Sequence, residues 1–172
     1  GCEYQDSVFV QLFSTPRFTL AQEVYETCVG NDITVLGPDT NITLAFNWSK
    51  NNQTVFTGKD FTTNVPGVYV LQVTDSNKCR ATDNAELIFN ANPVAVATAS
   101  SYSCTERSVA LNGQGGVSYE WSSDNGNQSN KKRYVITNIQ HADSGWYQLV
   151  VTNEKLCTDT TEVFLEVRQT PD

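Results

Sequence analysis

The feature that most constrains this chain is an internal repeat with a period of about 77 residues. Three segments, 2–16, 79–93 and 157–171, each begin with a cysteine, continue as an apolar strand-like run and end at a proline. Cys28 and Cys104 form a second series, 76 residues apart. Because markers of different residue types share one spacing, the sequence predicts a repeated folding unit rather than a single large domain.

The period divides the chain of 172 residues into three parts. We interpret residues 1–16 as the last strand and linker of a preceding repeat, and residues 17–93 and 94–172 as two complete domains. A domain of this size needs large core side chains or a covalent crosslink for stability. We therefore expect a piece of a longer exported protein whose neighbouring repeats are its first partners.

Short strand-like runs separated by turn signals predict an all-β fold, with each domain a β-sandwich of antiparallel strands. In the second repeat we expect strands near 94–100, 108–112, 117–122, 132–138, 146–152 and 158–167. The sequence Asp124-Asn125-Gly126 favours a hairpin turn between two of these runs, because asparagine and glycine tolerate positive φ. No stretch shows the apolar period of a helix.

Two pairs of aromatic residues follow the same period and are expected in the domain cores. Trp48 and Trp121 alternate with residues that would face solvent, and Tyr69 and Tyr147 lie on a later strand of each repeat. We interpret all four as core residues rather than ligand contacts. Successive side chains of a strand face opposite sides, so Trp146 should point outward, and it is our candidate for a contact with a partner.

The segment Asp143-Ser144-Gly145-Trp146-Tyr147 resembles the tyrosine corner of immunoglobulin domains, and Pro66-Gly67-Val68-Tyr69 is a weaker version of it. Most such domains carry a disulfide between their two sheets. Apolar residues stand at those cysteine positions here, namely Leu111 and Leu149 in the second repeat and Val35 and Leu71 in the first. We expect apolar contacts to replace that bond.

The whole repeat, from Cys28 through Trp48 and Tyr69 to Cys79 and Pro93, resembles the immunoglobulin-like and PKD-like repeats of very large exported proteins of Bacteroidetes-type bacteria. That family includes gliding-motility adhesins. The resemblance implies export to the bacterial outer surface, tandem domains and a role in adhesion.

The immunoglobulin-like segment 143–147 departs from that bacterial pattern and leaves an animal cell-adhesion protein open. In a eukaryotic protein, four Asn-x-Ser/Thr sequons would be candidate glycosylation sites, at Asn41, Asn47, Asn52 and Asn127. In a bacterial protein the same sequons reflect only an Asn- and Thr-rich surface.

Five cysteines indicate an oxidising compartment. The matched spacings of 51 and 53 residues predict one disulfide in each domain, Cys28–Cys79 and Cys104–Cys157, with Cys2 unpaired. The alternative pairs, Cys2–Cys28 and Cys79–Cys104, would join neighbouring repeats. This alternative pairing stays open because the two cysteines of one domain need not lie close together in an immunoglobulin layout.

Charge and residue types exclude several function classes. The net charge is −8 and the only basic cluster is 131–133, so we expect no nucleic-acid partner. No apolar run is long enough for a membrane helix, so we expect no direct membrane insertion. His141 is the only histidine, which leaves no serine or cysteine nucleophile with a base. We therefore predict that the chain is not an enzyme.

We expect no cofactor and no metal site formed by cysteines, because no two cysteines are close in sequence. Calcium at acidic positions such as Asp75, Asp83 or Asp124 stays open, although their spacing matches no defined calcium loop.

Three functions fit these observations. The first is a repeat segment of a secreted or cell-surface adhesin, acting as a stalk or spacer or as an adhesive array that binds a surface polysaccharide or a protein. The second is a non-catalytic carbohydrate-binding module of a secreted enzyme, which would need an exposed aromatic platform. The third is the ectodomain of a eukaryotic cell-adhesion receptor, which occupied sequons would support.

Overall fold

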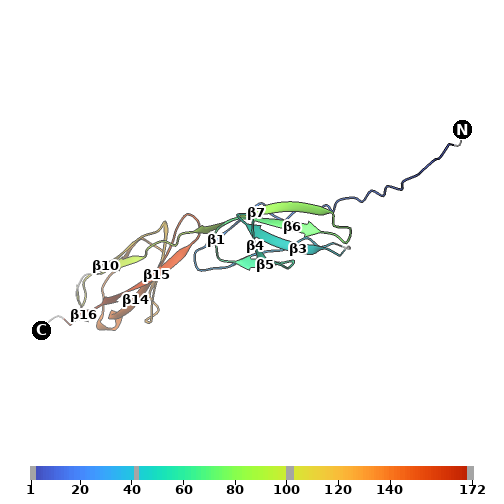
Figure 1. Ribbon diagram of the computed structural model, residues 1–172. Helices are drawn as coiled ribbons and strands as arrows, with labels where there is room; N and C mark the ends of the chain where they lie inside the picture. Colours follow the sequence, from blue (N-terminus) through green and yellow to red (C-terminus); the bar gives the residue numbers. More distant parts are fainter. Residues whose placement is uncertain (1–2, 41–42, 100–102, 170–172) are drawn as a thin grey trace. The chain divides into compact units, whose positions relative to one another are not determined.

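The computed structural model describes residues 3–40, 43–99 and 103–169. Its regular elements within these ranges are strands, apart from one 3-10 turn, η1 (His141–Asp143). Contacts divide the chain into two compact units (Figure 1): unit 1 comprises Gly1–Glu26 and Gly30–Phe89, and unit 2 comprises Thr27–Val29 and Asn90–Asp172. The predicted all-β class is confirmed.

The strands of the first repeat form a sheet and a separate pair. They are β1 (Val24–Cys28), β2 (Ile33–Val35), β3 (Ala45–Lys50), β4 (Gln53–Phe56), β5 (Phe61–Thr63), β6 (Gly67–Thr74) and β7 (Arg80–Asn90). The sheet has the order β1-β7-β6-β3-β4, and β2 pairs with β5. The neighbours β4, β3, β6 and β7 run antiparallel, as do β2 and β5.

The second repeat has the same plan with more, shorter strands. They are β8 (Val96–Thr98), β9 (Ser103–Cys104), β10 (Val109–Gln114), β11 (Ser118–Ser123), β12 (Gln128–Ser129), β13 (Arg133–Ile136), β14 (Gly145–Thr152), β15 (Thr158–Leu165) and β16 (Val167–Arg168). Two antiparallel sheets have the orders β12-β11-β14-β15 and β13-β10-β8. The short pair β16-β9 is parallel.

Each unit has its own apolar core, to which strands of both its sheets contribute. In unit 2 the core joins Leu111 of β10 to Trp121 of β11 and Leu149 of β14. In unit 1 it joins Val35 of β2 to Trp48 of β3. Strand alternation produces this arrangement, because every second side chain faces the opposite sheet. Two sheets packed over one core make each unit a β-sandwich.

The tryptophan anchors satisfy their polar atoms without leaving the core. Trp48 is fully buried and Trp121 is 2% exposed. The indole Nε1–H of Trp121 donates to the carbonyl of Lys131 at 3.0 Å, and that of Trp48 donates to the carbonyl of Gly58 at 3.2 Å. A buried indole that keeps its hydrogen bond contributes its whole ring area to the core without a desolvation penalty.

Both units contain a tyrosine corner with the same hydrogen bond. The hydroxyl of Tyr147 donates to the carbonyl of Asp143 at 3.1 Å, and the hydroxyl of Tyr69 donates to the carbonyl of Val65 at 3.0 Å. Each tyrosine follows a glycine with positive φ by two residues, +156° in unit 2 and +136° in unit 1. The weaker sequence motif of the first repeat therefore forms the same corner as the stronger one.

The structural units do not coincide with the sequence repeats. The boundary falls between Phe89 and Asn90 rather than after Pro93, and residues 27–29 of the first repeat belong to unit 2. Strand β1 therefore begins in unit 1 and ends in unit 2. The strand expected within 1–16 is not present in residues 3–16, which contain no regular element. An isolated strand has no neighbour to supply its hydrogen bonds.

Candidate functional site

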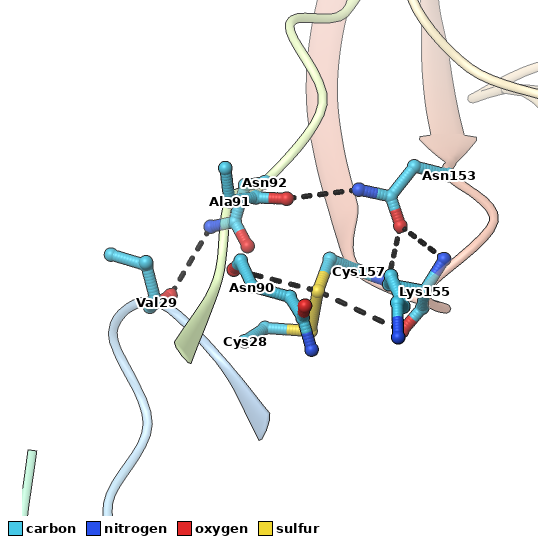
Figure 2. Close-up of a disulfide and its surroundings, with 8 residues drawn as sticks. All are labelled: Cys28, Val29, Asn90, Ala91, Asn92, Asn153, Lys155 and Cys157. Atoms are coloured by element: carbon cyan, nitrogen blue, oxygen red, sulfur yellow. Dashed lines mark hydrogen bonds between the residues drawn. A yellow bond between two sulfur atoms is a disulfide. The ribbon is translucent and has the colours of Figure 1, made fainter. Parts of the chain in front are cut away.

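The disulfide of the structure joins Cys28, at the end of β1, to Cys157, the residue immediately before β15 (Figure 2). Their Cα atoms are 5.5 Å apart and 129 residues separate them in sequence. This corrects the predicted pairs Cys28–Cys79 and Cys104–Cys157, and equally the alternatives Cys2–Cys28 and Cys79–Cys104. Among the described cysteines, Cys79 and Cys104 are free and half-buried, and Cys2 lies outside the described residues.

Strand length explains why the expected pair within the first repeat does not form. The backbone N–H of Val29 donates to the carbonyl of Asn90 at 2.9 Å, so Cys28 lies beside the last residue of β7. Cys79 immediately precedes the first residue of that strand. Ten residues of extended strand span about 33 Å. A disulfide requires Cα atoms within about 7 Å of each other, so Cys28 and Cys79 cannot be bonded.

The turn that carries Cys157 is held by the side chain of Asn153. Its Oδ1 accepts hydrogen bonds from the backbone N–H groups of Lys155, at 2.9 Å, and Cys157, at 3.0 Å (Figure 2). An asparagine that accepts from its own turn fixes a tight loop without help from other segments. Leu156 completes the turn with φ at +61°. The turn therefore presents Cys157 in one defined position.

The segment that faces this turn is also held by side-chain amides. Asn153 Nδ2 donates to the carbonyl of Ala91 at 2.9 Å, and Asn92 Nδ2 donates to the carbonyl of Val29 at 3.3 Å (Figure 2). The sulfur of Cys157 lies 3.7 Å from the carbonyl oxygen of Asn90. Cys157 is fully buried. Residues 27–29 and 90–92 are thus packed around the disulfide as part of unit 2.

A second candidate feature is an exposed aromatic pair on the outer face of the sheet β12-β11-β14-β15. Trp146 is 54% exposed, whereas the adjacent Tyr147 is fully buried. Trp146 lies opposite Phe164 of β15, which is 48% exposed, and the two rings meet edge to face at 5.3 Å. The sequence analysis did not single out Phe164. Its position between the inward-facing Val163 and Leu165 would have indicated it.

A shallow hollow adjoins this aromatic pair. Its volume is about 290 Å³. Its lining is mostly polar and consists of Ser122, Ser123, Asp124, Trp146, Gln148 and Glu162. The pair and the hollow together give unit 2 an amphipathic surface. In unit 1 the position of Trp146 is occupied by Val68, which is 51% exposed and much smaller.

Two of the three acidic residues considered for calcium accept hydrogen bonds from backbone N–H groups. Asp75 Oδ1 accepts from the N–H of Cys79 at 2.8 Å, and Asp83 accepts from the N–H groups of Leu20 and Asn84, both at 2.8 Å. Asp124 lies exposed in the β11–β12 hairpin, beside the hollow. Within the described ranges no three histidine, cysteine or acidic side chains gather as a metal site would require.

The single histidine is part of the second tyrosine corner. His141 Nδ1 lies 2.9 Å from the carbonyl oxygen of Val167, which also accepts a hydrogen bond from the hydroxyl of Ser144. The backbone N–H of Val167 in turn donates to that hydroxyl at 2.8 Å. This network fastens η1 to β16.

In the part of the chain that the structure describes, no helix is long and apolar enough to cross a membrane.

Comparison with known proteins supports the fold through structure rather than sequence. No protein-family model and no curated protein matches the chain. It is similar to the crystal structure of the N-terminal eight Ig domains of Down Syndrome Cell Adhesion Molecule, isoform 1.30.30. The TM-score is 0.61 at 13% identity, over 88% of this chain and 24% of that one.

Two shorter proteins of known structure resemble the chain more loosely. The amphioxus IgVJ-C2 molecule gives a TM-score of 0.40 at 17% identity, over 81% of this chain and 98% of that one. Immunoglobulin domains 1–4 of Sidekick-1 give 0.40 at 18% identity, over 87% and 48%. The likeness to the Down Syndrome Cell Adhesion Molecule structure, at a TM-score of 0.61, shows that the chain has an immunoglobulin-like fold, as the tyrosine-corner motif predicted.

Proposed function

We propose that this chain is a segment of an exported cell-surface protein, in which immunoglobulin-like units act as a non-enzymatic spacer or adhesive array. The observation that carries the proposal is the Cys28–Cys157 disulfide, which joins cysteines of two successive repeats. Disulfides of this structural kind persist in oxidising compartments and are rare in the cytosol. A chain whose repeats are crosslinked in this way fits an extracellular load-bearing or contact role.

The use of the polar side chains supports a structural role. Asn153 and Asp75 hold their hairpin turns, and Asp83 caps the backbone of an incoming segment. His141 and Asp143 are engaged in the tyrosine corner of unit 2. These groups are committed to backbone hydrogen bonds and are not directed together at one point, as general acid-base catalysis would require.

Within this proposal, the resemblance of the repeat to surface proteins of Bacteroidetes-type bacteria favours the bacterial outer surface. The alternative, a eukaryotic receptor, would require occupied sequons. Asn127 Nδ2 already donates to Asp143 Oδ1 and to the hydroxyl of Tyr147, both at 3.2 Å. A glycan on that nitrogen would leave one hydrogen for two acceptors, which argues against glycosylation at Asn127 in the folded chain.

The proposal is tested by locating the protein in the organism that encodes it. Antibodies raised against the folded chain should label intact cells as strongly as permeabilised cells, with a cytosolic protein as the control for integrity. External protease should remove the signal. Labelling that appears only after permeabilisation would contradict a surface role, whatever the disulfide pattern of the purified protein.

The aromatic pair Trp146–Phe164 supports a more specific role, in which unit 2 contacts a protein partner through its outer sheet face. Aromatic side chains are over-represented where such contacts carry most of the binding energy. Beads coated with the chain should bind cells of the source organism. Trp146→Ala should weaken binding at least tenfold, and Val68→Ala, the matched change in unit 1, should leave it unchanged.

The same two variants distinguish the carbohydrate-binding alternative. Strong, Trp146-dependent binding to a glycan array would favour a polysaccharide ligand over a protein. Equal bead binding by both variants would mean that this face is not the contact surface, and the spacer role would remain.

A further inference from the structure

The free thiol of Cys79 lies in a turn that has the same conformation as the turn carrying the bonded Cys157. In the Cys79 turn, the N–H of Asp75 donates to the carbonyl of Cys79 at 3.0 Å, and the N–H of Cys79 donates to Asp75 Oδ1 at 2.8 Å. The corresponding distances between Asn153 and Cys157 are 2.9 Å and 3.0 Å. The residues before the two cysteines have φ of +68° and +61°. The two turns are equivalent.

The free thiol of Cys104 lies at the end of β9, a position equivalent to that of the bonded Cys28 at the end of β1. The residue after Cys28, Val29, donates its N–H to the carbonyl of Asn90 at the end of the last long strand, at 2.9 Å. The residue after Cys104 is Thr105, and its N–H donates to the carbonyl of Arg168 at 2.9 Å. Asn90 and Arg168 are 78 residues apart and occupy equivalent strand ends.

Burial distinguishes the bonded cysteine from its free counterpart. Cys157 is fully buried, because residues 27–29 and 90–92 pack around it within unit 2. Cys79 has the same local turn but is only half-buried. Its surroundings within the described residues therefore lack the segment that covers Cys157. One contact also differs, since Asp75 lacks the amide with which Asn153 donates to Ala91.

The disulfide joins Cys28 of one repeat to Cys157 of the next repeat. We propose that Cys79 and Cys104 each form a crosslink of the same kind, with a cysteine of an adjoining repeat. Cys104 bonds to the Cys157-type cysteine of a following repeat, and Cys79 bonds to the Cys28-type cysteine of a preceding repeat. The partner in each case is another immunoglobulin-like repeat of the same kind.

This inference extends the proposed function, because export supplies the oxidant. Formation of each bond converts two thiols to a disulfide and releases two protons and two electrons. A small-molecule or protein disulfide accepts them: one cysteine thiolate attacks it to give a mixed disulfide, and the second thiolate then displaces a thiol. The oxidant ends as two thiols, so the exchange is balanced. Tethering in one polypeptide raises the effective concentration of the two cysteines.

The inference is tested with two copies of the chain in one polypeptide, in which residue 172 of the full chain is followed directly by residue 18 of a second copy. This junction continues the period. It separates Cys104 of the first copy from Cys79 of the second by nearly the 129 residues found between Cys28 and Cys157. Cys2 is replaced by alanine, and the protein is folded in a mixture of reduced and oxidised glutathione.

Two matched variants make the assignment unambiguous. Variant A carries Cys79→Ala in the first copy and Cys104→Ala in the second, so it keeps only the two cysteines that the inference joins. Variant B carries the opposite pair of changes and keeps the two cysteines at the outer positions. Non-reducing peptide mapping by mass spectrometry should find a Cys79–Cys104 crosslink within single molecules of variant A. In variant B both thiols should remain free.

Each outcome decides the question. Free thiols in variant A, or a crosslink only between separate molecules, would overturn the inference, provided that Cys28–Cys157 has formed in both copies as the internal control for folding. An equal crosslink in variant B would overturn it as well. Because glutathione is supplied in the tube, failure here would not bear on export, and absence from the cell surface would leave this result intact.

Discussion

Removal of the Cys28–Cys157 disulfide should destabilise unit 2 far more than unit 1. The bond closes a segment of 129 residues, for which the chain-entropy relation gives about 5 kcal/mol. When unit 2 unfolds alone, unit 1 still holds Glu23 against Glu86 through a backbone hydrogen bond, so the effective loop runs only from there to Cys157. The same relation then gives about 4 kcal/mol, because the dependence on loop length is logarithmic.

Native-state hydrogen exchange, followed by mass spectrometry, resolves the two units. Peptides from β14 report on unit 2 and peptides from β6 report on unit 1. In a Cys28→Ala/Cys157→Ala variant, a loss of about 4 kcal/mol corresponds to a rise of roughly 1,000-fold in the exchange of the best-protected β14 amides. Exchange in β6 should change less than about tenfold, because unit 1 keeps its own core.

The matched control is Cys79→Ala/Cys104→Ala, which removes the two thiols that are free in this chain. Its β14 and β6 peptides should exchange as in the parent protein. The reasoning would be refuted if the disulfide variant changed β14 exchange less than about threefold, or if β6 and β14 accelerated equally.

Four further expectations concern the turn and the buried tyrosines. Asn153→Asp keeps the oxygen that accepts from Cys157 but removes the donor to Ala91, so it should lower the unfolding free energy of unit 2 by about 1 kcal/mol in urea titrations. Tyr147→Phe loses the hydroxyl that bonds to Asp143 and Asn127 and should cost unit 2 about 1–2 kcal/mol. Tyr69→Phe should cost unit 1 about 1 kcal/mol; effects below about 0.3 kcal/mol would contradict this account. Burial raises the pKa of Tyr147, and likewise that of Tyr134, above the ordinary value of about 10. Their contribution to stability is therefore present below pH 10 and is lost as pH rises through the raised pKa. Tyrosinate absorbance and urea unfolding at successive pH values would measure this loss. Ionisation of these tyrosines at the ordinary pKa in the folded protein would contradict the expectation.

The sequence predicted the features that depend on local pattern. Alternation placed Trp48 and Trp121 in the cores and turned Trp146 outward, and the corner motif located the hydrogen bond of Tyr147. These features follow from neighbouring residues, because side-chain direction on a strand has a fixed period.

The disulfide pairing could not be obtained in the same way. In a periodic sequence, bonds within one repeat and bonds between successive repeats give equally regular spacings, so 28→79 and 28→157 fit the same series. Only the register between β1 and β7, which places Val29 beside Asn90, shows that Cys28 is a full strand length away from Cys79. Register depends on long-range pairing, which local residue preferences do not encode.

The transfer of residues 27–29 to unit 2 affects how such a chain can be cut into independent pieces. A recombinant fragment that starts at the repeat boundary, residue 94, would lack both Cys28 and the carbonyl of Ala91. Cys157 would then have no cysteine with which to form its disulfide. The smallest self-sufficient excerpt that contains unit 2 must therefore begin upstream of β1. In gene engineering, transfer of both repeats together would preserve the Cys28–Cys157 disulfide, whereas transfer of either repeat alone would separate its two cysteines.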